Sequence, residues 1–474
     1  MDVESRIRDG RMTRFQALTV FVCMLTVISD GYDILAVSLA IPYFSGDWNL
    51  QPSDIGYVVS ASTAGMVVGA LVLAPMGDRF GRRLMGLVGQ ALVTVGMFLA
   101  WLAPGLETLL GARFITGIGI GAVTAVMGVI VAEFSTTKWL GFNMAAYSAG
   151  TGLGGFLAGV IAATAIPMLG WKSMFLIGTI INVVILLICV IGLPESIQFL
   201  STRFQKRSRS LEKVNRLLAR MGREPIADLP ASPPPGKTSP RVGLRELVSP
   251  KVLRITLLLA ASYCLIQGWF YFNLGWTPQL ITTATSDPAL GTLFGTLAPL
   301  GGMIGGLLYG FISLKIANKP LTVTALFVTA LGAGLLGYFL SQQDIPLFIP
   351  LGMAIGYGAA LGGMYTLIPA SYPTRMRASA FGWISGLGRI AATVGPILAG
   401  YLMEGGWTGS ALFLGSAVIL AVAAALVIPV RPRYEDPQDD DGTEPTGSDH
   451  VANADADRDA DVDVDVVPGT SSVR

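Results

Sequence analysis

Two carboxylates, Asp30 and Asp33, lie three residues apart inside an apolar run from Phe15 to Ile41. This run is long enough to cross a bilayer, since about twenty apolar residues suffice. An ionised side chain near the membrane centre is costly, so it is retained mainly where it faces a bundle interior or a water-filled path. The i, i+3 spacing places both carboxyls on nearly the same face of a helix. We therefore expect Asp30 and Asp33 to have a functional role inside a membrane protein, where a single lumen could serve both.

Two arginines in other apolar runs, Arg113 and Arg389, provide fixed positive charges. Counting about 1.5 Å per helical residue places Arg113 at the depth of Asp33, where the two could pair, and Arg389 near the depth of Asp30. A guanidinium stays protonated and binds a carboxylate through two parallel hydrogen bonds. We therefore expect Arg389 to bind the carboxylate of an anionic substrate. Arg113 is either a second substrate contact or a bridge between helices.

The composition is that of an integral membrane protein. Of the 474 residues, 52% are hydrophobic and 13% are charged, which is far more apolar than a soluble domain. The single histidine, His450, and the three cysteines form no metal-ligand pattern, and no nucleophile motif occurs in the apolar runs. The sequence therefore predicts a protein that is not an enzyme, with no bound metal and no cofactor.

Windows of about nineteen residues identify twelve apolar segments that are long enough to span a bilayer. Six precede a hydrophilic region and six follow it, which predicts an all-α integral membrane fold of two pseudo-symmetric six-helix bundles. The first six segments are Gln16–Ala40, Gly56–Pro75, Leu84–Ala103, Leu106–Phe134, Phe142–Met168 and Ser173–Leu193. The second six are Val252–Leu274, Leu290–Leu314, Leu321–Leu340, Ile345–Ala370, Ala378–Met403 and Ser410–Val430.

The segments divide the chain into four predicted regions. We expect an N-terminal bundle over residues 1–193, a basic and proline-rich cytoplasmic linker over 194–250, a C-terminal bundle over 251–430, and a disordered acidic cytoplasmic tail over 431–474. Lysine and arginine gather in alternate loops, which predicts that both termini are cytoplasmic. Within the linker, Arg209–Arg220 is either an amphipathic helix on the inner leaflet or a solvated connector.

A glycine-rich pattern recurs at Gly150–Gly159 in the fifth span and at Gly386–Gly400 in the eleventh. These are corresponding positions of the two halves. Parallel six-helix repeats with a binding site at their interface are typical of one large class of secondary transporters.

The turn after the second span, Ala74–Arg83, resembles the signature loop of the major facilitator superfamily. Gly81 permits a sharp bend between antiparallel helices, and a charge latch that opens and closes can form around Asp78. The loop departs from the family pattern at Ala74, and the equivalent loop after the eighth span, Ser313–Lys319, lacks the aspartate and the glycines. The resemblance implies a gating role for Gly77, Asp78, Arg79, Gly81, Arg82 and Arg83.

Within that superfamily, the chain resembles the aromatic acid:proton symporter family. The matching motifs are Asp30-Gly31-Tyr32-Asp33, Arg113–Gly121 followed by Glu133, Pro194-Glu195-Ser196, and Gly388-Arg389. The resemblance implies proton coupling by Asp30, Asp33 and Glu133. Substrate contacts are predicted at Arg389, Arg113 and Tyr32. Aromatic residues in spans seven and ten lie at depths suited to stacking on a ring; among Tyr263, Trp269, Tyr271, Phe272, Tyr357 and Tyr365, we select Trp269 and Tyr365.

These expectations combine into a functional prediction. The protein is expected to import an aromatic carboxylic acid of the benzoate or hydroxybenzoate type by proton symport, through alternating access. Its predicted partners are a small organic anion, protons and the lipid bilayer, with no nucleic acid, and it is expected to act as a monomer in the plasma membrane. An aliphatic organic acid:proton symporter, a drug:proton antiporter and a non-transporting membrane sensor remain as alternatives.

Overall fold

The computed structural model describes residues 7–8, 10–201, 207–229, 244–250 and 252–430. Within these ranges, twelve helices are long and apolar enough to cross a membrane, and they correspond one to one with the twelve segments predicted from hydropathy. The predicted acidic tail, residues 431–474, lies outside the described residues. The fold is all-α, with two six-helix bundles, as predicted.

The first half of the structure comprises residues 14–192 and contains six spans. The second span is one continuous rod in which a π-helical turn, η1, joins α3 to α4. The elements are α2 (Arg14–Phe44), α3 (Pro52–Val68), η1 (Gly69–Leu73), α4 (Ala74–Phe80), α5 (Arg82–Leu102), α6 (Leu106–Phe134), α7 (Thr137–Leu169) and α8 (Lys172–Gly192). The second half comprises α12 (Leu253–Thr285), α13 (Pro288–Ile312), α14 (Asn318–Gln342), α15 (Phe348–Ala370), α16 (Thr374–Glu404) and α17 (Gly409–Val427).

Most helices extend beyond the apolar windows that predict them. The first span begins at Arg14 and ends at Phe44, where hydropathy places it between Gln16 and Ala40. Its start is fixed by Thr13, whose side chain accepts a hydrogen bond from the Gln16 backbone in a capping box. Hydropathy windows stop at the first polar residues, whereas the backbone stays helical until a cap or a turn ends it.

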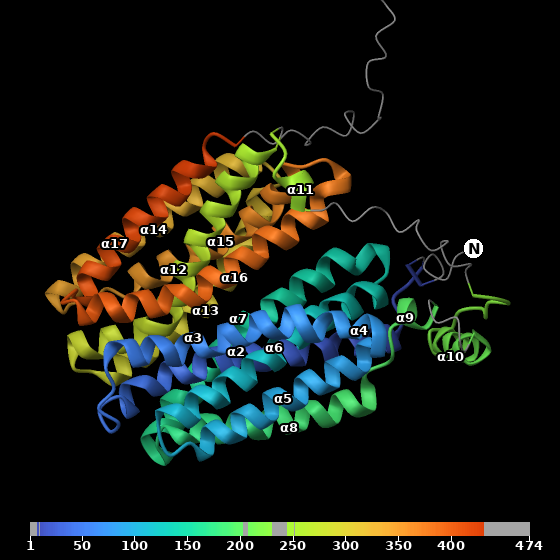
Figure 1. Ribbon diagram of the computed structural model, residues 1–474, viewed down its shortest axis with the longest axis horizontal. Helices are drawn as coiled ribbons and strands as arrows, with labels where there is room; N and C mark the ends of the chain where they lie inside the picture. The colour runs from blue at the N-terminus through green and yellow to red at the C-terminus, as the bar shows by residue number, and fades with distance from the viewer. Residues whose placement is uncertain (1–6, 9, 202–206, 230–243, 251, 431–474) are drawn as a thin grey trace, which may run out of the picture. The chain divides into compact units, whose positions relative to one another are not determined.

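The two halves lie side by side, with α3 packed on α16 and α7 packed on α13 (Figure 1). Inside the first half, α2 packs on α7. Gly31 makes this contact possible, because a Cβ atom at this position would overlap the carbonyl oxygen of Thr151. This close contact sets the rotation of α2 about its axis. Asp30 and Asp33 then point into the protein interior, where both are buried.

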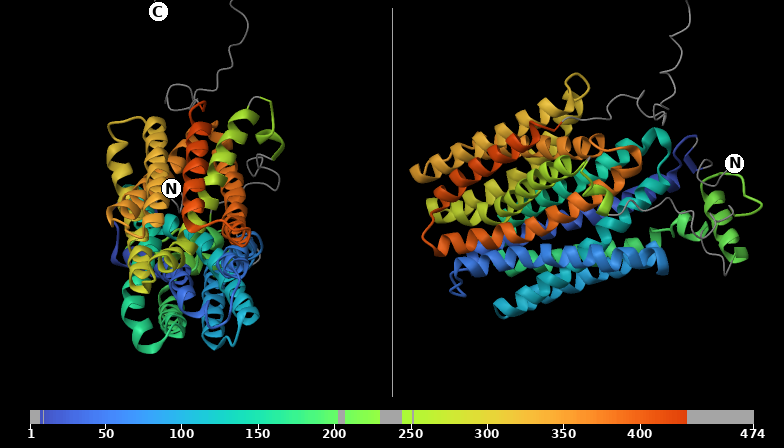
Figure 2. Two further views of the ribbon diagram at one scale, coloured as in Figure 1. Left: turned by 90° about the vertical axis from the view of Figure 1, so that its left-hand side faces the viewer. Right: turned by 45° about the horizontal axis from the view of Figure 1, so that its top comes forward.

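Three shorter helices belong to the segment between the halves: α9 (Ile197–Ser201), α10 (Arg207–Arg220) and α11 (Leu244–Leu247). Figures 1 and 2 show α9 and α10 at the end of the first half where the α4–α5 turn lies, which we call the linker end. The apolar side chains of α10, Val214, Leu217 and Leu218, are buried in one cluster with Phe199. This face therefore contacts protein, which corrects both alternatives considered for Arg209–Arg220, a lipid-bound helix and a solvated connector.

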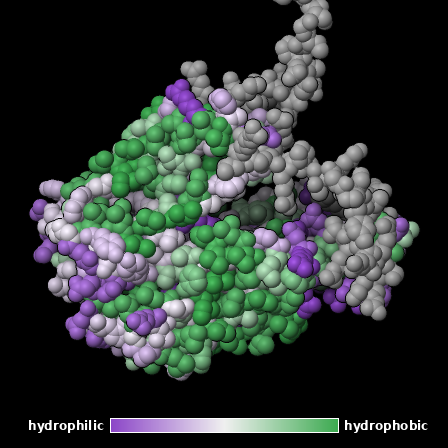
Figure 3. Space-filling view, in the orientation of Figure 1, coloured by the Kyte–Doolittle hydropathy of each residue, from purple (hydrophilic) through white to green (hydrophobic). Residues whose placement is uncertain are grey.

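The outer surface of the helices is apolar along their length, and hydrophilic residues gather toward the helix ends on the face shown in Figure 3. Large apolar side chains such as Leu71, Ile191 and Phe311 are 72%, 86% and 71% exposed. Soluble proteins rarely expose apolar surface on this scale. Together with the twelve spans, this surface identifies a multi-pass membrane protein.

Candidate functional site

A cavity of about 230 Å³ lies between the two halves. The first half contributes Thr63 and Met66 from α3, and the second half contributes residues of α12, α15 and α16, including Tyr365 and Arg389. The cavity thus lies at the interface of the six-helix repeats, where secondary transporters of this architecture bind their substrates. Two predicted substrate contacts, Arg389 and Tyr365, line it.

Arg389 is the positive charge of this cavity. Its side chain is half-buried, and no hydrogen bond or ion pair to its guanidinium occurs among the described residues. Ser385 and Phe381 line the same cavity one and two helical turns before it on α16. A guanidinium that lacks a protein partner beside a cavity is suited to bind an anion, most effectively a carboxylate.

The wall of the cavity is rich in aromatic rings and hydrogen-bonding groups. Tyr263, Gln267 and Tyr271 project from successive turns of α12. Tyr365 is 43% exposed, because it borders the cavity, and its ring packs edge-on against Phe381 with 5.5 Å between centroids. Such a wall can stack on a flat ring and form hydrogen bonds to its substituents.

Trp269 and Tyr32 do not line this cavity. Trp269 is 5% exposed and packs against Tyr357, with 5.7 Å between ring centroids. Tyr32 is 2% exposed, and its hydroxyl donates to the carbonyl oxygen of Met174 at 2.9 Å. In this conformation, both residues pack inside their own halves, so the structure does not bring these two predicted substrate contacts to the cavity.

Asp33 and Arg113 form an ion pair inside the first half. Arg113 Nη1 donates to Asp33 Oδ1 at 2.6 Å, and the two side chains are 1% and 0% exposed. The pairing expected from helix depth is therefore present. Arg113 joins α6 to α2 and does not line the 230 Å³ cavity, so its predicted contact with a substrate stays a prediction.

Asp30 lies one helical turn from the ion pair and has no such partner. It is 5% exposed, and its Oδ1 atom forms no hydrogen bond with the described residues. It lies within electrostatic range of both Arg389 and Arg113. The structure thus brings the two aspartates and the two membrane arginines into one group of charges beside the cavity.

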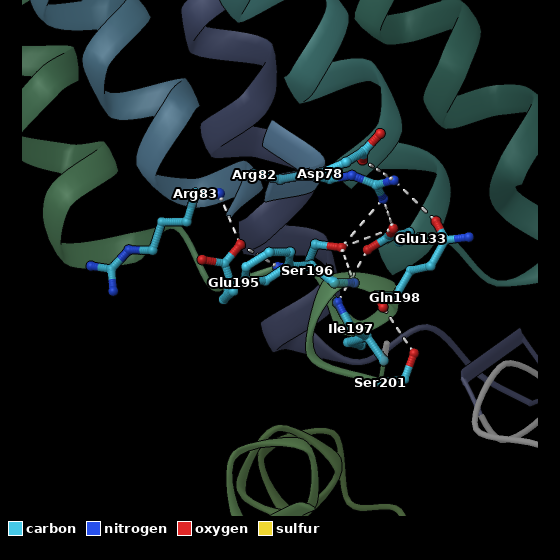
Figure 4. A network of polar contacts seen from close by, with 10 residues as sticks. Asp78, Arg82, Arg83, Glu133, Glu195, Ser196, Ile197, Gln198 and Ser201 are labelled. Carbon is cyan, nitrogen blue, oxygen red and sulfur yellow. Dashed lines mark hydrogen bonds and ion pairs between the residues drawn. The ribbon is translucent and has the colours of Figure 1, made fainter. Parts of the chain in front are cut away.

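Glu133 lies apart from these charges, in a network at the linker end (Figure 4). Arg82 forms an ion pair with Glu133. It forms a second ion pair with Asp78, in which Arg82 Nη2 lies 3.2 Å from Asp78 Oδ1. The same guanidinium donates to Ser196 Oγ at 3.3 Å and to Gln198 Oε1 at 3.1 Å. Glu133 therefore lies in the polar network of the α4–α5 turn, away from Asp30 and Asp33.

The loop backbone is held by Glu195 of the Pro-Glu-Ser motif (Figure 4). Glu195 Oε1 accepts from the Arg83 backbone N–H at 3.0 Å and from that of Ser196 at 3.1 Å. Gly81 has a φ of +115°, and a Cβ atom there would lie 2.6 Å from Glu195 Oε2. Glycine is thus required both by the backbone conformation and by the closeness of the carboxylate.

The other predicted loop residues support this turn. The Gly77 carbonyl oxygen accepts from the Gly81 N–H at 3.0 Å, Arg79 lies over the Phe80 ring at 5.4 Å, and Arg83 Nη2 donates to the Val190 carbonyl oxygen at 2.6 Å. Asp78 is 73% exposed. The main acidic partner of Arg82 is therefore Glu133, which is 15% exposed, and the exposed Asp78 is secondary.

Some cavity residues were not selected from the sequence, namely Thr63, Gln267, Phe381 and Ser385. For three of them, helical periodicity in the sequence could have predicted that they share a face with a selected or candidate residue. Phe381 and Ser385 share a face with Arg389, and Gln267 lies one turn from Tyr263 and Tyr271. Thr63 comes from the other half of the chain, and only the packing of the halves brings it to the cavity.

Comparisons with known proteins place this architecture in a family. A sequence model of the Major Facilitator Superfamily matches residues 21–351 and 264–453. The 4-hydroxybenzoate transporter PcaK of Acinetobacter baylyi is 30% identical over 439 residues, covering 91% of this chain and 94% of that protein. The gallate transporter of Pseudomonas putida is 29% identical over 449 residues, covering 90% and 94%.

The fold is also similar to solved structures. The crystal structure of a D-xylose-proton symporter matches with a TM-score of 0.68 at 16% identity, covering 88% of this chain and 98% of that one. The curated relatives are named as transporters, which are not enzymes. The chain therefore belongs to the major facilitator superfamily.

Proposed function

We propose that this protein imports an aromatic carboxylic acid together with protons by alternating access. The observation that carries the proposal is the guanidinium of Arg389, which has no partner among the residues that the structure describes and borders a cavity between the halves with a tyrosine-rich wall. Relatives that match about nine-tenths of the chain are named for 4-hydroxybenzoate and gallate, which are single-ring acids. Arg389 binds the carboxylate, and Tyr365 and its neighbours contact the ring.

The size of the cavity supports a small substrate. Its volume is about 230 Å³, whereas sites for drug-sized ligands occupy about 300–1,000 Å³. This difference favours a single-ring acid over the substrate of a drug antiporter. One chain contains the whole cavity, so we propose that the monomer is the transporting unit.

Proton coupling is assigned to Asp30 and Asp33. Asp30 lies within the electrostatic influence of Arg389, the guanidinium to which we assign the substrate carboxylate. When the substrate takes the guanidinium as its partner, Asp30 loses part of its counter-charge, and a proton can replace it. Binding of the anion and binding of the proton are thereby linked, and the loaded carrier has fewer uncompensated charges when it reorients.

Alternating access requires contacts between the halves that break and form again. At the end opposite the linker end, the Tyr57 and Tyr401 hydroxyls lie 2.6 Å apart, and the Ser53 backbone N–H donates to Glu404 Oε1 at 3.1 Å. We propose that this end faces the outside of the plasma membrane and that both termini are cytoplasmic, because lysine and arginine concentrate in the linker-end loops. The loop network of Arg82 then acts as a latch on the inner side.

Uptake assays test the transport activity. Cells that express the protein are given labelled benzoate, 4-hydroxybenzoate, gallate and an aliphatic acid, with and without a protonophore. Accumulation of an aromatic acid that the protonophore abolishes supports the proposal. Accumulation that increases when the gradient is collapsed indicates an antiporter, exclusive uptake of the aliphatic acid indicates the other symporter class, and absence of uptake indicates a sensor.

Binding to purified protein tests Arg389. Because a hydrogen bond to a charged group is worth about 1.5–3 kcal/mol, Arg389→Ala should weaken binding of 4-hydroxybenzoate by about ten- to a hundredfold. Arg389→Lys should lose less, since it keeps the charge but not the two-pronged geometry. The uncharged 4-hydroxybenzamide should bind wild type poorly and lose little further in Arg389→Ala.

Arg377 provides a matched control on the same helix, because its Nε atom donates to the Tyr372 carbonyl oxygen at 3.2 Å and it does not line the cavity. Arg377→Ala should leave the affinity for the acid unchanged. Equal losses for acid and amide in Arg389→Ala would show that Arg389 stabilises the helices instead of binding the ligand.

A further inference from the structure

A second, smaller space of about 10 Å³ adjoins the ion pair at Arg113. Its wall includes Ser38 of α2 and Ser62 of α3. Thr63 and Tyr271 also line it, and the same two residues line the 230 Å³ cavity. The smaller space is therefore a neighbour of the substrate cavity on one side and of the Asp33–Arg113 pair on the other.

Several polar atoms near this space lack hydrogen-bond partners among the described residues. They are Ser62 Oγ and Arg113 Nε, which belong to residues that line the space, and Asp33 Oδ2, which belongs to the ion-pair partner of Arg113. A buried polar atom without a partner is unfavourable, and proteins commonly satisfy such atoms with a buried water. One water needs a cavity volume of about 10–15 Å³ and polar neighbours. The space has a volume of about 10 Å³ and polar residues in its wall, among them Ser62 and Arg113, so it meets both requirements.

The local sequence explains why Ser62 lies beside Arg113. Gly117 follows Arg113 by one turn on the same face of α6. A Cβ atom at Gly117 would overlap the backbone of Ser62, so α3 and α6 touch through their backbones at this level. The absence of a side chain at Gly117 thus lets Ser62, which is 3% exposed, line the same small space as Arg113.

We propose that this space is a water site, that Ser62 and Arg113 bind the water, and that the water links the substrate cavity to the Asp33–Arg113 pair. A proton that arrives from the cavity is accepted by the water while the water releases another proton to the Asp33 carboxylate, so the water is regenerated. Ser62 is then a positioning residue for proton coupling. This inference rests on the proton symport proposed above.

The position of Tyr271 supports the link. Its side chain lines both spaces, and it lies within electrostatic range of Asp30 and Arg389. Thr63 and Tyr271 thus connect the wall of the substrate cavity with the wall of the smaller space at Arg113.

The test compares two serines of α3 in purified protein reconstituted into vesicles. Ser62→Ala removes a ligand of the proposed water, and Ser62→Val fills the space with methyl groups. The matched control is Ser60→Ala, because Ser60 is 2% exposed and its Oγ atom also lacks a partner, but it does not line the space. Each variant is assayed with labelled 4-hydroxybenzoate for counterflow exchange, which needs no gradient, and for accumulation driven by a proton gradient.

We expect Ser62→Ala to lower the initial rate of gradient-driven uptake about tenfold, the effect of one hydrogen bond to a charged group, with counterflow unchanged. Ser62→Val should lose more of the driven uptake, and Ser60→Ala should match wild type in both assays. Driven uptake at the wild-type rate in Ser62→Ala would overturn the water site, as would an equal loss of counterflow. Wild-type protein that exchanges substrate but does not accumulate it under the gradient would overturn the symport itself, and with it the role of Ser62.

Discussion

The buried pair of Asp33 and Arg113 provides a quantitative test of how the first half is held together. The side chains are 0% and 1% exposed, with 2.6 Å between Oδ1 and Nη1. Removing one partner of such a pair leaves an uncompensated buried charge, which costs about 3–5 kcal/mol. We therefore expect Arg113→Ala and Asp33→Asn each to lower the free energy of unfolding by about that amount. Denaturant unfolding of the purified protein in detergent measures it.

The double variant separates charge from packing. Asp33→Asn combined with Arg113→Gln replaces the pair by two amides that can still bond to each other, and neither member is charged. Replacing both partners of a buried pair is far less costly than removing one. The double variant should therefore be more stable than either single variant. The loss of unfolding free energy in the double variant is then smaller than the sum of the two single losses, so the coupling energy has the opposite sign to those losses.

A surface pair supplies the control. Arg216 and Glu212 lie 2.8 Å apart on α10, with side chains that are 66% and 68% exposed. Exposed pairs contribute about 0–1 kcal/mol, so Arg216→Ala should change stability little. The reasoning is refuted if Arg113→Ala is no more destabilising than Arg216→Ala, or if the double variant loses the sum of the single effects.

Two further predictions concern transport. Asp30→Asn should abolish gradient-driven uptake while protein level and unfolding stability stay near wild type, because Asp30 forms no ion pair within the described part of the chain. Normal accumulation would show that Asp30 does not couple protons. Glu133→Gln should slow transport more than Asp78→Asn, since Glu133 is 15% exposed and Asp78 is 73% exposed, and neither should alter the ranking of substrates in uptake competition. A changed ranking, or a larger effect at Asp78, would contradict the latch described around Arg82.

The sequence alone determined the parts that depend on local chemistry. Twelve apolar segments are visible because each span must be apolar over about twenty residues, and the structure confirms all twelve. Asp30, Asp33, Arg113 and Arg389 stand out because charges are rare in such segments. Their depths follow from the rise of the helix, which is sufficient to match Asp33 with Arg113.

Only the tertiary structure decided which side chains share a space. Helix depth is known from the sequence, but the rotation of each helix and the packing of the halves depend on side chains from distant segments. This is why Tyr365 lines the cavity while Trp269 and Tyr32 pack inside their own halves. Helix packing likewise places Glu133 in the loop network, because its partner Arg82 comes from another helix. The contact of Ser62 with the Arg113 region follows from backbone packing at Gly117, and no pattern within α3 alone predicts it.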